Sequence, residues 1–133
     1  MEFAFKIDDQ DVSASAFLNL AQRVWPGNYE PSLVQESLRR TLQITAWSGD
    51  LLIGCVRILS DGYFFSTIPE ILVDPGYQRR GVGRRLMDLA WEHSPTSLFF
   101  GAQPGNEAFF AKCGFERSIS SFARKKSRPS LRT

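Results

Sequence analysis

The sequence predicts a single domain of the α+β class. Three observations predict it. The chain has 133 residues, 43% of them hydrophobic, which is enough for one buried core. Short strand patterns and amphipathic helix patterns follow one another along the chain, and no internal repeat or Gly/Ser linker divides it. We expect one domain over residues 1–126 and a basic, disordered tail over residues 127–133.

The first third of the chain predicts one strand and two helices. Phe3, Phe5 and Ile7 recur at every second position, which is the period of a half-buried strand. Ser13 is a suitable N-cap for a helix that carries apolar residues on one face. Pro31 suits the first turn of a second amphipathic helix.

Three strands are predicted next. Residues 43–48 and 51–59 flank a Gly49-Asp50 turn and predict a hairpin. Asp61-Gly62 is a turn that leads into a third strand over residues 63–73. The middle of the chain therefore predicts an antiparallel meander.

The last third predicts two more helices with a strand between them. An amphipathic helix is expected over residues 83–93 and a short buried strand over residues 97–102. Asn106 is a suitable N-cap for a helix over residues 107–113, which Gly114 ends in the left-handed conformation. The remaining apolar positions predict one or two closing strands: Phe115, Ile119 and Phe122.

Charge and composition argue against several classes of function. The net charge is only +2, so the chain lacks the strong positive field of a dedicated nucleic-acid binder. The first ten residues do not read as a secretory signal, and no apolar stretch approaches the roughly 18 residues that span a bilayer. Two cysteines and one histidine form no metal-ligand pattern. We expect a cytoplasmic protein with no metal, no nucleic acid and no membrane partner.

The motif with the clearest chemistry is a glycine loop between a strand and a helix. A strand pattern ends at Val73-Asp74-Pro75, the segment Gln78-Arg79-Arg80-Gly81-Val82-Gly83 follows, and a helix begins. Such a loop lets backbone N–H groups and the positive end of a helix dipole approach a phosphate. The spacing lacks the third glycine of a dinucleotide fingerprint and the Gly-Lys-Ser/Thr of a nucleoside triphosphate loop.

This segment resembles the signature of the GNAT superfamily of acetyl-CoA-dependent N-acetyltransferases, Arg/Gln-x-x-Gly-x-Gly/Ala after a strand that ends near Val-x-Pro. Gln78, Gly81 and Gly83 match it. Residues 106–115 resemble a shortened form of a second family motif, Asn-x-x-Ala-x-x-x-Tyr-x-x-x-Gly-Phe, with Asn106 nearer to the aromatic pair than in the family. The resemblance covers about residues 3–126. It implies a mixed, mostly antiparallel sheet of about six or seven strands flanked by about four helices, in three α/β/α layers.

The resemblance implies acetyl-CoA as cosubstrate. In this family the backbone of the strand before the loop pairs with the pantetheine arm, and amides of the loop bind the pyrophosphate, here with added charge from nearby arginines. The cofactor-binding residues that it implies are Ile71, Leu72, Val73, Gln78, Arg79, Arg80, Gly81, Val82, Gly83, Arg84, Asn106, Phe109 and Phe110.

The family reaction is a direct attack of an amine on the thioester in a ternary complex. Glu70 is the candidate general base, with a surface glutamate as the alternative. A backbone N–H near Leu72 or Val73 is the candidate oxyanion contact, with Val73 preferred. Pro69 predicts a kink or bulge in the strand beside Glu70. Phe110 stands where the family often has a tyrosine as general acid, so solvent would supply that proton.

The resemblance implies that the segment joining the first two helices selects the acceptor, a primary amine of a small molecule or a peptide. Trp25, Tyr29 and Glu30 are the candidate pocket residues there, with ordinary aromatic packing as the alternative. Two other functions stay open: a catalytically weak acyl-CoA-binding regulatory module, and a nucleic-acid-binding module that uses the arginine loop and the tail. Small members of the family commonly dimerise, so the resemblance also implies a homodimer.

Overall fold

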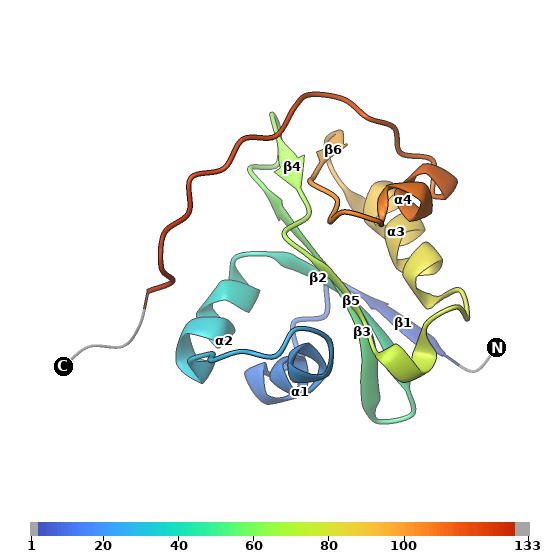
Figure 1. The fold of residues 1–133 in the computed structure, drawn as a ribbon. Coiled ribbons are helices and arrows are strands. Elements are labelled where there is room, and N and C mark those ends of the chain that lie inside the picture. Colours follow the sequence, from blue (N-terminus) through green and yellow to red (C-terminus); the bar gives the residue numbers. More distant parts are fainter. Residues whose placement is uncertain (1–2, 130–133) are drawn as a thin grey trace.

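The computed structural model describes residues 3–129 and confirms the α+β class (Figure 1). The order of elements also follows the prediction as far as the last helix. In chain order they are β1 (Ala4–Ile7), α1 (Ala14–Val24), α2 (Pro31–Arg39), β2 (Leu42–Ser48), β3 (Leu51–Ser60), β4 (Ser66–Thr67), β5 (Ile71–Val73), the 3-10 turn η1 (Pro75–Tyr77), α3 (Val82–His93), β6 (Leu98–Phe99) and α4 (Glu107–Lys112).

The six described strands form one sheet that divides at its end. Its order is β1-β2-β3-β4-β6, and β5 pairs separately with β3. All pairs are antiparallel except β4 with β6. The long strand β3 pairs with β4 near its last residues (Leu59 with Thr67) and with β5 near its first residues (Gly54 with Val73). β4 and β5 therefore lie one after the other along β3, and only β4 continues into β6.

The predicted strand over residues 63–73 is wrong as a single element. It consists of β4 and β5, and residues 68–70 between them form no strand. Pro69 lies in this break, where its missing N–H cannot contribute to the ladder. The predicted kink at Pro69 is thus confirmed, and it allows β5 to diverge from β6.

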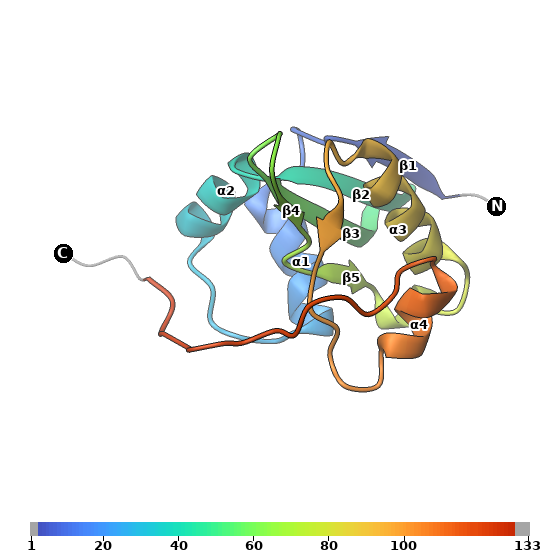
Figure 2. The ribbon, with the colours of Figure 1, turned by 90° about the horizontal axis from the view of Figure 1, so that it is seen from above.

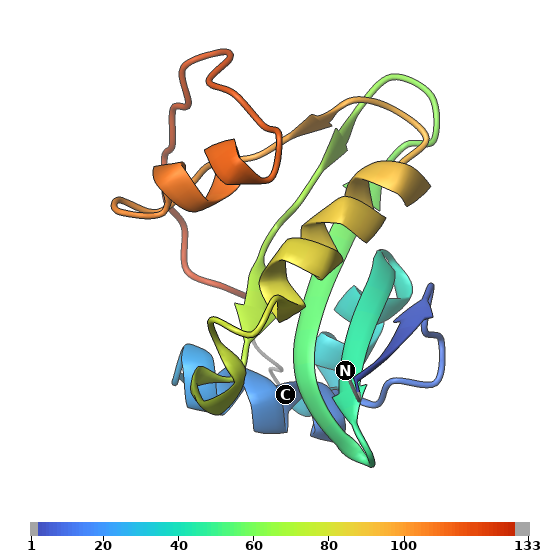
Figure 3. The same ribbon diagram turned by 90° about the vertical axis from the view of Figure 1, so that its right-hand side faces the viewer.

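Helices cover both faces of the sheet, which confirms the three predicted layers (Figures 2 and 3). In Figure 3, α3 lies in front of the sheet, α4 lies on the same side, and α1 and α2 lie behind. Each face has its own core. Ile53 and Val56 pack with Leu86 and Met87 on the α3 side, whereas the side of α1 and α2 buries Phe17, Leu20, Leu38, Leu52 and Leu72.

Most predicted helix ends are confirmed. The Ser13 hydroxyl accepts a hydrogen bond from the N–H of Ala16 at 3.1 Å, and Pro31 occupies the first turn of α2. Gly114 follows α4 with a φ of 92°. Asn106 occupies the N-cap position of α4, but among the described residues its side chain makes no capping hydrogen bond.

The predicted closing strands are wrong. Residues 116–129 form neither helix nor strand, and Ile119 and Phe122 are 77% and 95% exposed. β6 has two residues instead of the predicted 97–102, so its edge offers few backbone groups for another strand to pair with. Residues 116–129 instead run from α4 around the molecule toward α2 (Figures 1 and 2). The last four residues of the predicted tail, 130–133, lie outside the described residues.

Within residues 3–129, no helix has the length and apolar character that crossing a membrane requires.

Candidate active site

Strand β5 has one edge that no other described strand covers. The N–H of Asp74 donates to the carbonyl of Ile53 at 2.8 Å, and the N–H of Arg57 donates to the carbonyl of Glu70 at 3.4 Å. Backbone groups of successive residues in an antiparallel strand face opposite sides. Ile71 and Val73 therefore direct their N–H and carbonyl groups away from β3.

This alternation divides the three predicted pantetheine-binding residues. Leu72 is in phase with the residues that pair with β3, so its backbone groups are used within the sheet. Ile71 and Val73 retain outward groups, although the side-chain amide of Gln78 donates to the carbonyl of Val73 at 3.2 Å. The Val73 N–H points away from β3, toward the uncovered edge.

The glycine loop ends at an open helix N-terminus. Gly81 is the N-cap of α3 with a φ of 85°, and Arg79 has a φ of 63°. Apart from Gly81 itself and its two chain neighbours, no described atom lies within 4 Å of the position that a Cβ on Gly81 would occupy. Among the described residues, no side chain caps this helix. The first-turn N–H groups of α3 are therefore available to an anion.

Two glycines allow the surrounding elements to converge on this N-terminus. A Cβ on Gly83 would lie 3.2 Å from the ring of Phe109 and 3.6 Å from a methyl group of Val73. A Cβ on Gly54 of β3 would lie 3.0 Å from Leu86 and 3.1 Å from Val82. Gly54 has no role in the sequence-based prediction. A glycine inside a strand pattern is the signal that marks such a close approach.

A buried carboxylate joins the loop to the opposite layer. Asp74, directly after β5, accepts from the N–H of Gly76 at 2.8 Å and pairs with Nε of Arg23 at 2.7 Å. The same guanidinium donates to the carbonyl of Leu52 at 3.2 Å. Sequence reasoning does not find Arg23, because it lies on α1, 51 residues from Asp74.

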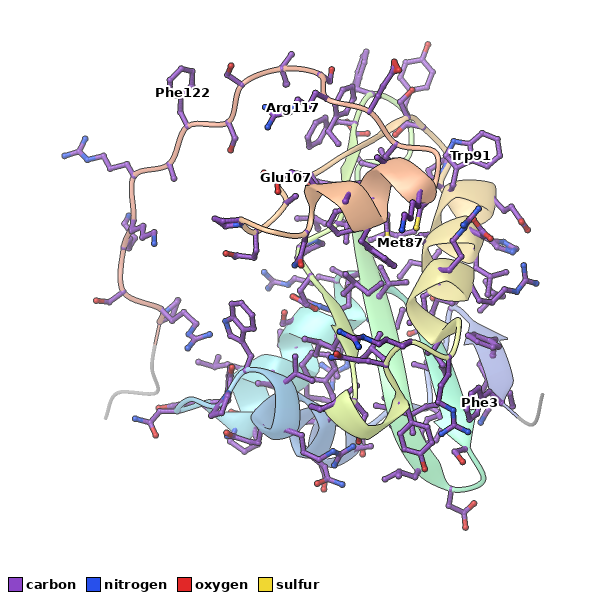
Figure 4. All side chains as sticks on the ribbon, turned by 45° about the vertical axis from the view of Figure 1, so that its right-hand side comes forward. Phe3, Met87, Trp91, Glu107, Arg117 and Phe122 are labelled. Carbon is purple, nitrogen blue, oxygen red and sulfur yellow. The ribbon has the colours of Figure 1, made fainter. Side chains whose placement is uncertain are left out.

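The side chain of Arg80 is directed toward β1. Its guanidinium lies 5.2 Å from the ring centres of both Phe3 and Tyr77, and Figure 4 shows Phe3 beside the start of α3. A cavity of about 300 Å³ lies at this point, lined by Phe3, Phe5, Arg80, Gly81, Val82 and Arg85. Stacking of this kind favours a fixed position for the guanidinium.

The other predicted phosphate-binding arginines differ in their partners. Arg84 lies 3.7 Å from Asp88 one turn along the exposed face of α3. For Arg79, no ion pair or ring contact with any described residue is present. Arg79 is therefore the arginine of the loop whose charge is least engaged by the described part of the protein.

Glu70 is held by a two-point ion pair. Its Oε1 accepts from Nη2 of Arg57 at 2.7 Å, and its Oε2 accepts from Nε of the same guanidinium. Arg57 also donates to the hydroxyl of Ser37 at 3.0 Å and lies 5.9 Å over the ring of Phe17. Burial lowers the pKa of Arg57, the hydrogen bond and charge of Glu70 raise it, and the net pKa lies above its ordinary value. The pair joins β3 and the start of β5 to both helices of the opposite layer.

The buried thiol of Cys55 lies in the same region. Burial raises its pKa, and the negative charge of Glu70 adds to that rise. The thiol therefore stays protonated, as expected of a small buried packing residue.

The first aromatic residues of α4 pack together. The ring of Phe110 lies 4.8 Å from Phe100 and 5.1 Å from Phe109, both in edge-to-face contact. Phe110 therefore belongs to an aromatic cluster that fixes α4 on the core. Asn106 lies one turn earlier, and its side-chain amide makes no hydrogen bond to a described residue.

The predicted acceptor residues share one loop. The hydroxyl of Tyr29 donates to the carbonyl of Trp25 at 2.6 Å. The side-chain amide of Gln22 exchanges two hydrogen bonds with the backbone of Gly27, at 2.8 and 3.1 Å. The indole of Trp25 is 56% exposed, and Glu30 is the N-cap residue of α2. These contacts fix the loop that carries all three predicted residues.

Within residues 3–129, His, Cys, Asp and Glu side chains form no group of three or more that could hold a metal ion.

The comparisons with known proteins identify the family. The model of the acetyltransferase (GNAT) domain matches residues 40–117. This range includes β5, the glycine loop, α3 and α4. The chain therefore belongs to the GNAT acetyltransferase family, whose members are acyltransferases.

One sequence relative is the protein named histone acetyltransferase TAP1 from Glycine max, which is 51% identical over 71 residues. The match covers 49% of this chain and 30% of that protein, so the chain spans about a third of the length of this curated relative. A putative acetyltransferase from Deinococcus radiodurans R1 shares the fold, with a TM-score of 0.79 at 23% identity over 93% of this chain and 89% of that chain.

A third similar protein was solved with a ligand. AAC(6')-Iy in complex with the bisubstrate analog CoA-S-monomethyl-acetylneamine has a TM-score of 0.72 at 17% identity, over 96% of this chain and 100% of that chain. At this identity, the likeness concerns the fold alone.

Proposed function

We propose that this protein transfers the acetyl group of acetyl-CoA to a primary amine of a small molecule or peptide, by direct attack in a ternary complex. One observation carries the proposal: the open N-terminus of α3 lies behind the glycine loop and next to the uncovered edge of β5. A pyrophosphate fits the helix N-terminus. The amide groups of a pantetheine arm fit the outward groups of Ile71 and Val73 as a paired strand would.

The residues around this edge supply the remaining roles. The Val73 N–H donates to the carbonyl oxygen as it becomes an oxyanion. Phe109, which packs on Gly83, and the side-chain amide of Asn106 flank the pantetheine. Arg79 supplies positive charge at the phosphates. The guanidinium of Arg80 instead lies over Phe3 and Tyr77, and that of Arg84 lies near Asp88.

Proton removal is assigned to Glu70 acting through water. Both of its carboxylate oxygens already accept from Arg57. Each oxygen has a second lone pair, so a water can bridge the substrate amine and the carboxylate without breaking the ion pair.

The name of one sequence relative supports an acceptor class. The relative from Glycine max is called a histone acetyltransferase, which favours a peptide amine. A small-molecule amine is the alternative class of acceptor. A panel containing both kinds of amine, with free CoA as the readout, distinguishes them.

The cofactor site is tested with Gly81→Asp. This change places a carboxylate beside the incoming phosphates. A like charge at about 4 Å costs about 1–4 kcal/mol, so affinity for acetyl-CoA falls about fivefold or more. The matched control is Gly62→Asp in the β3–β4 turn, because Gly62 has a φ of 84° and equally open space. Both variants carry the same backbone strain, and calorimetric titration measures binding.

Equal affinities of the two glycine variants for acetyl-CoA would reject the helix N-terminus as the phosphate site. A loss confined to Gly81→Asp, with both variants folded by circular dichroism, is the expected result.

An acyl-CoA-binding regulatory module is the second candidate. The engagement of Glu70 by Arg57 and the packed phenyl ring of Phe110 favour it, since neither offers a free proton-transfer group. This candidate predicts acetyl-CoA binding without release of CoA across the whole amine panel. Turnover of any amine by the unaltered protein, together with its loss in Gly81→Asp, would reject this second candidate.

Three wider proposals accompany the activity. The catalytic domain lies within residues 1–126, which is supported by the end of the family match at residue 117. The protein acts in the cytoplasm, and it forms a homodimer, for which light scattering of the purified chain gives the mass directly.

A further inference from the structure

The chain after α4 forms an arch that is attached at both ends. We call residues 117–128 the C-terminal arch. At its start, Nη2 of Arg117 lies 3.9 Å from a carboxylate oxygen of Glu107 on α4. At its end, the guanidinium of Arg128 lies 4.8 Å over the ring of Tyr29. The residues between these contacts are all exposed and belong to no helix or strand.

The arch lies on the side of the molecule to which β5 turns its uncovered edge. Figures 1 and 2 show it running from α4 toward α2, past the loop between α1 and α2. Figure 4 shows Arg117 near Glu107 at its start and Phe122 pointing outward from its outer side. The arch thus connects the helix predicted to flank the pantetheine with the loop predicted to receive the acceptor.

The last part of the arch carries primary amines. Lys125 and Lys126 lie three and two residues before Arg128, and they are two of the four lysines of the chain. An extended residue spans at most about 3.6 Å, so both backbones stay within about 11 Å of the Arg128 contact. Both lysine side chains are exposed. Their amines therefore stay near the loop between α1 and α2, which is the predicted acceptor loop.

We infer that Lys125 and Lys126 are internal acceptors, so that the protein acetylates its own C-terminal arch. The inference rests on the proposed function. After its ammonium loses a proton, the neutral Nζ attacks the thioester carbonyl of acetyl-CoA. A C–N bond forms and the C–S bond breaks. CoA leaves as a thiolate. It takes the second proton that the lysine nitrogen loses after the attack, and the lysine becomes a neutral amide.

Arg128 and Tyr29 act together as positioning residues in this reaction. Their cation–π contact positions the arch, and the short connection raises the effective concentration of the amines at the loop. A weak acceptor pocket is then sufficient.

The experiment incubates the full chain with acetyl-CoA and follows each lysine by peptide mass spectrometry. Lys6 and Lys112 both lie outside the arch. Lys6, on β1, reports chemical acetylation by the thioester, whereas Lys112 lies on α4, the helix predicted to flank the pantetheine. We expect Lys125 or Lys126 to be labelled faster than these two lysines. The fraction labelled per unit time should not change with protein concentration, because the reaction is intramolecular.

Substitutions test whether the contact between Arg128 and Tyr29 promotes labelling of the arch. Arg128→Gln and Tyr29→Leu should each slow labelling of the arch by about twofold to fivefold, the range for an exposed cation–π contact. Arg124→Gln removes the same charge on the other side of the lysine pair, where the described residues provide no ring contact, and is the matched control. Arg128 lies on the exposed arch, so its substitution leaves the folded core intact.

Four outcomes would overturn the inference. Equal labelling of all four lysines would mean uncatalysed acetylation, and a rate per chain that rises with protein concentration would mean transfer between molecules. Turnover of the amine panel without labelling of the arch would reject the internal acceptor while keeping the proposed function. Absence of both would reject the proposed function itself.

Discussion

At the scale of single residues, Arg57 determines what Glu70 is able to do. The sequence identifies Glu70 as a carboxylate directly before the strand pattern that leads into the glycine loop. It does not reveal Arg57, which lies on the neighbouring strand and contacts Glu70 only after β3 and β5 pair. The partner of a charged side chain is set by sheet register, which sequence spacing does not contain.

The first prediction concerns this pair. Arg57→Gln leaves the carboxylate of Glu70 half-buried without its cation, so we expect the free energy of unfolding to fall by about 2 kcal/mol. Arg39→Gln is the control, since it breaks the exposed pair with Glu36 and should cost less than about 0.5 kcal/mol. Urea denaturation measures both variants. If the two variants lose the same stability, the Arg57–Glu70 pair is not a structural anchor.

At the scale of elements, the site depends on how closely α3 and α4 approach each other. The helix patterns and their caps could be predicted, because Ser13, Pro31 and Gly114 act within a few residues of their own position. The contact between Gly83 and Phe109 could not, since it joins residues on two helices. Strands were predicted less well than helices. The break at Pro69 and the missing closing strands depend on which neighbours are available to pair.

The second prediction tests that approach with Gly83→Ala. Alanine favours the helix by about 1 kcal/mol, but its Cβ would lie 3.2 Å from the ring of Phe109, which must move. We expect unchanged or raised thermal stability together with weaker acetyl-CoA binding. The double variant with Phe109→Leu, which removes the ring, should recover part of the affinity. Full affinity in Gly83→Ala alone would show that the position of Phe109 does not matter to the cofactor.

At the scale of the whole molecule, the two helical layers meet at the entry to the glycine loop. Arg23 on α1 holds Asp74, and Asp74 holds the turn that precedes the loop. The α+β class, the order of elements to α4 and the glycine loop could all be read from local patterns. The division of the sheet could not, because it arises when β4 and β5 share one long partner strand.

The third prediction concerns the end of the chain. Removing residues 118–133 deletes no described helix or strand, and it takes away the cation–π interaction of Arg128 with Tyr29. We expect the free energy of unfolding to change by less than about 1 kcal/mol, and acetyl-CoA binding to persist. Urea denaturation measures this stability, and we expect cooperative unfolding with nearly the same midpoint as the full chain. A large decrease in stability would mean that the arch stabilises the core, contrary to its exposure.

The uncovered edge of β5 also has a consequence for colloidal behaviour. A row of free backbone groups attracts any extended polypeptide, so a binding edge is at the same time a point of self-association. Two features limit this hazard: β5 has only three residues, and the residues before it include a proline that cannot extend the ladder. A cofactor bound along the same edge would shield it further. The cofactor would then act as a solubilising agent for the protein that uses it, and preparations kept with acetyl-CoA should stay monodisperse for longer during storage.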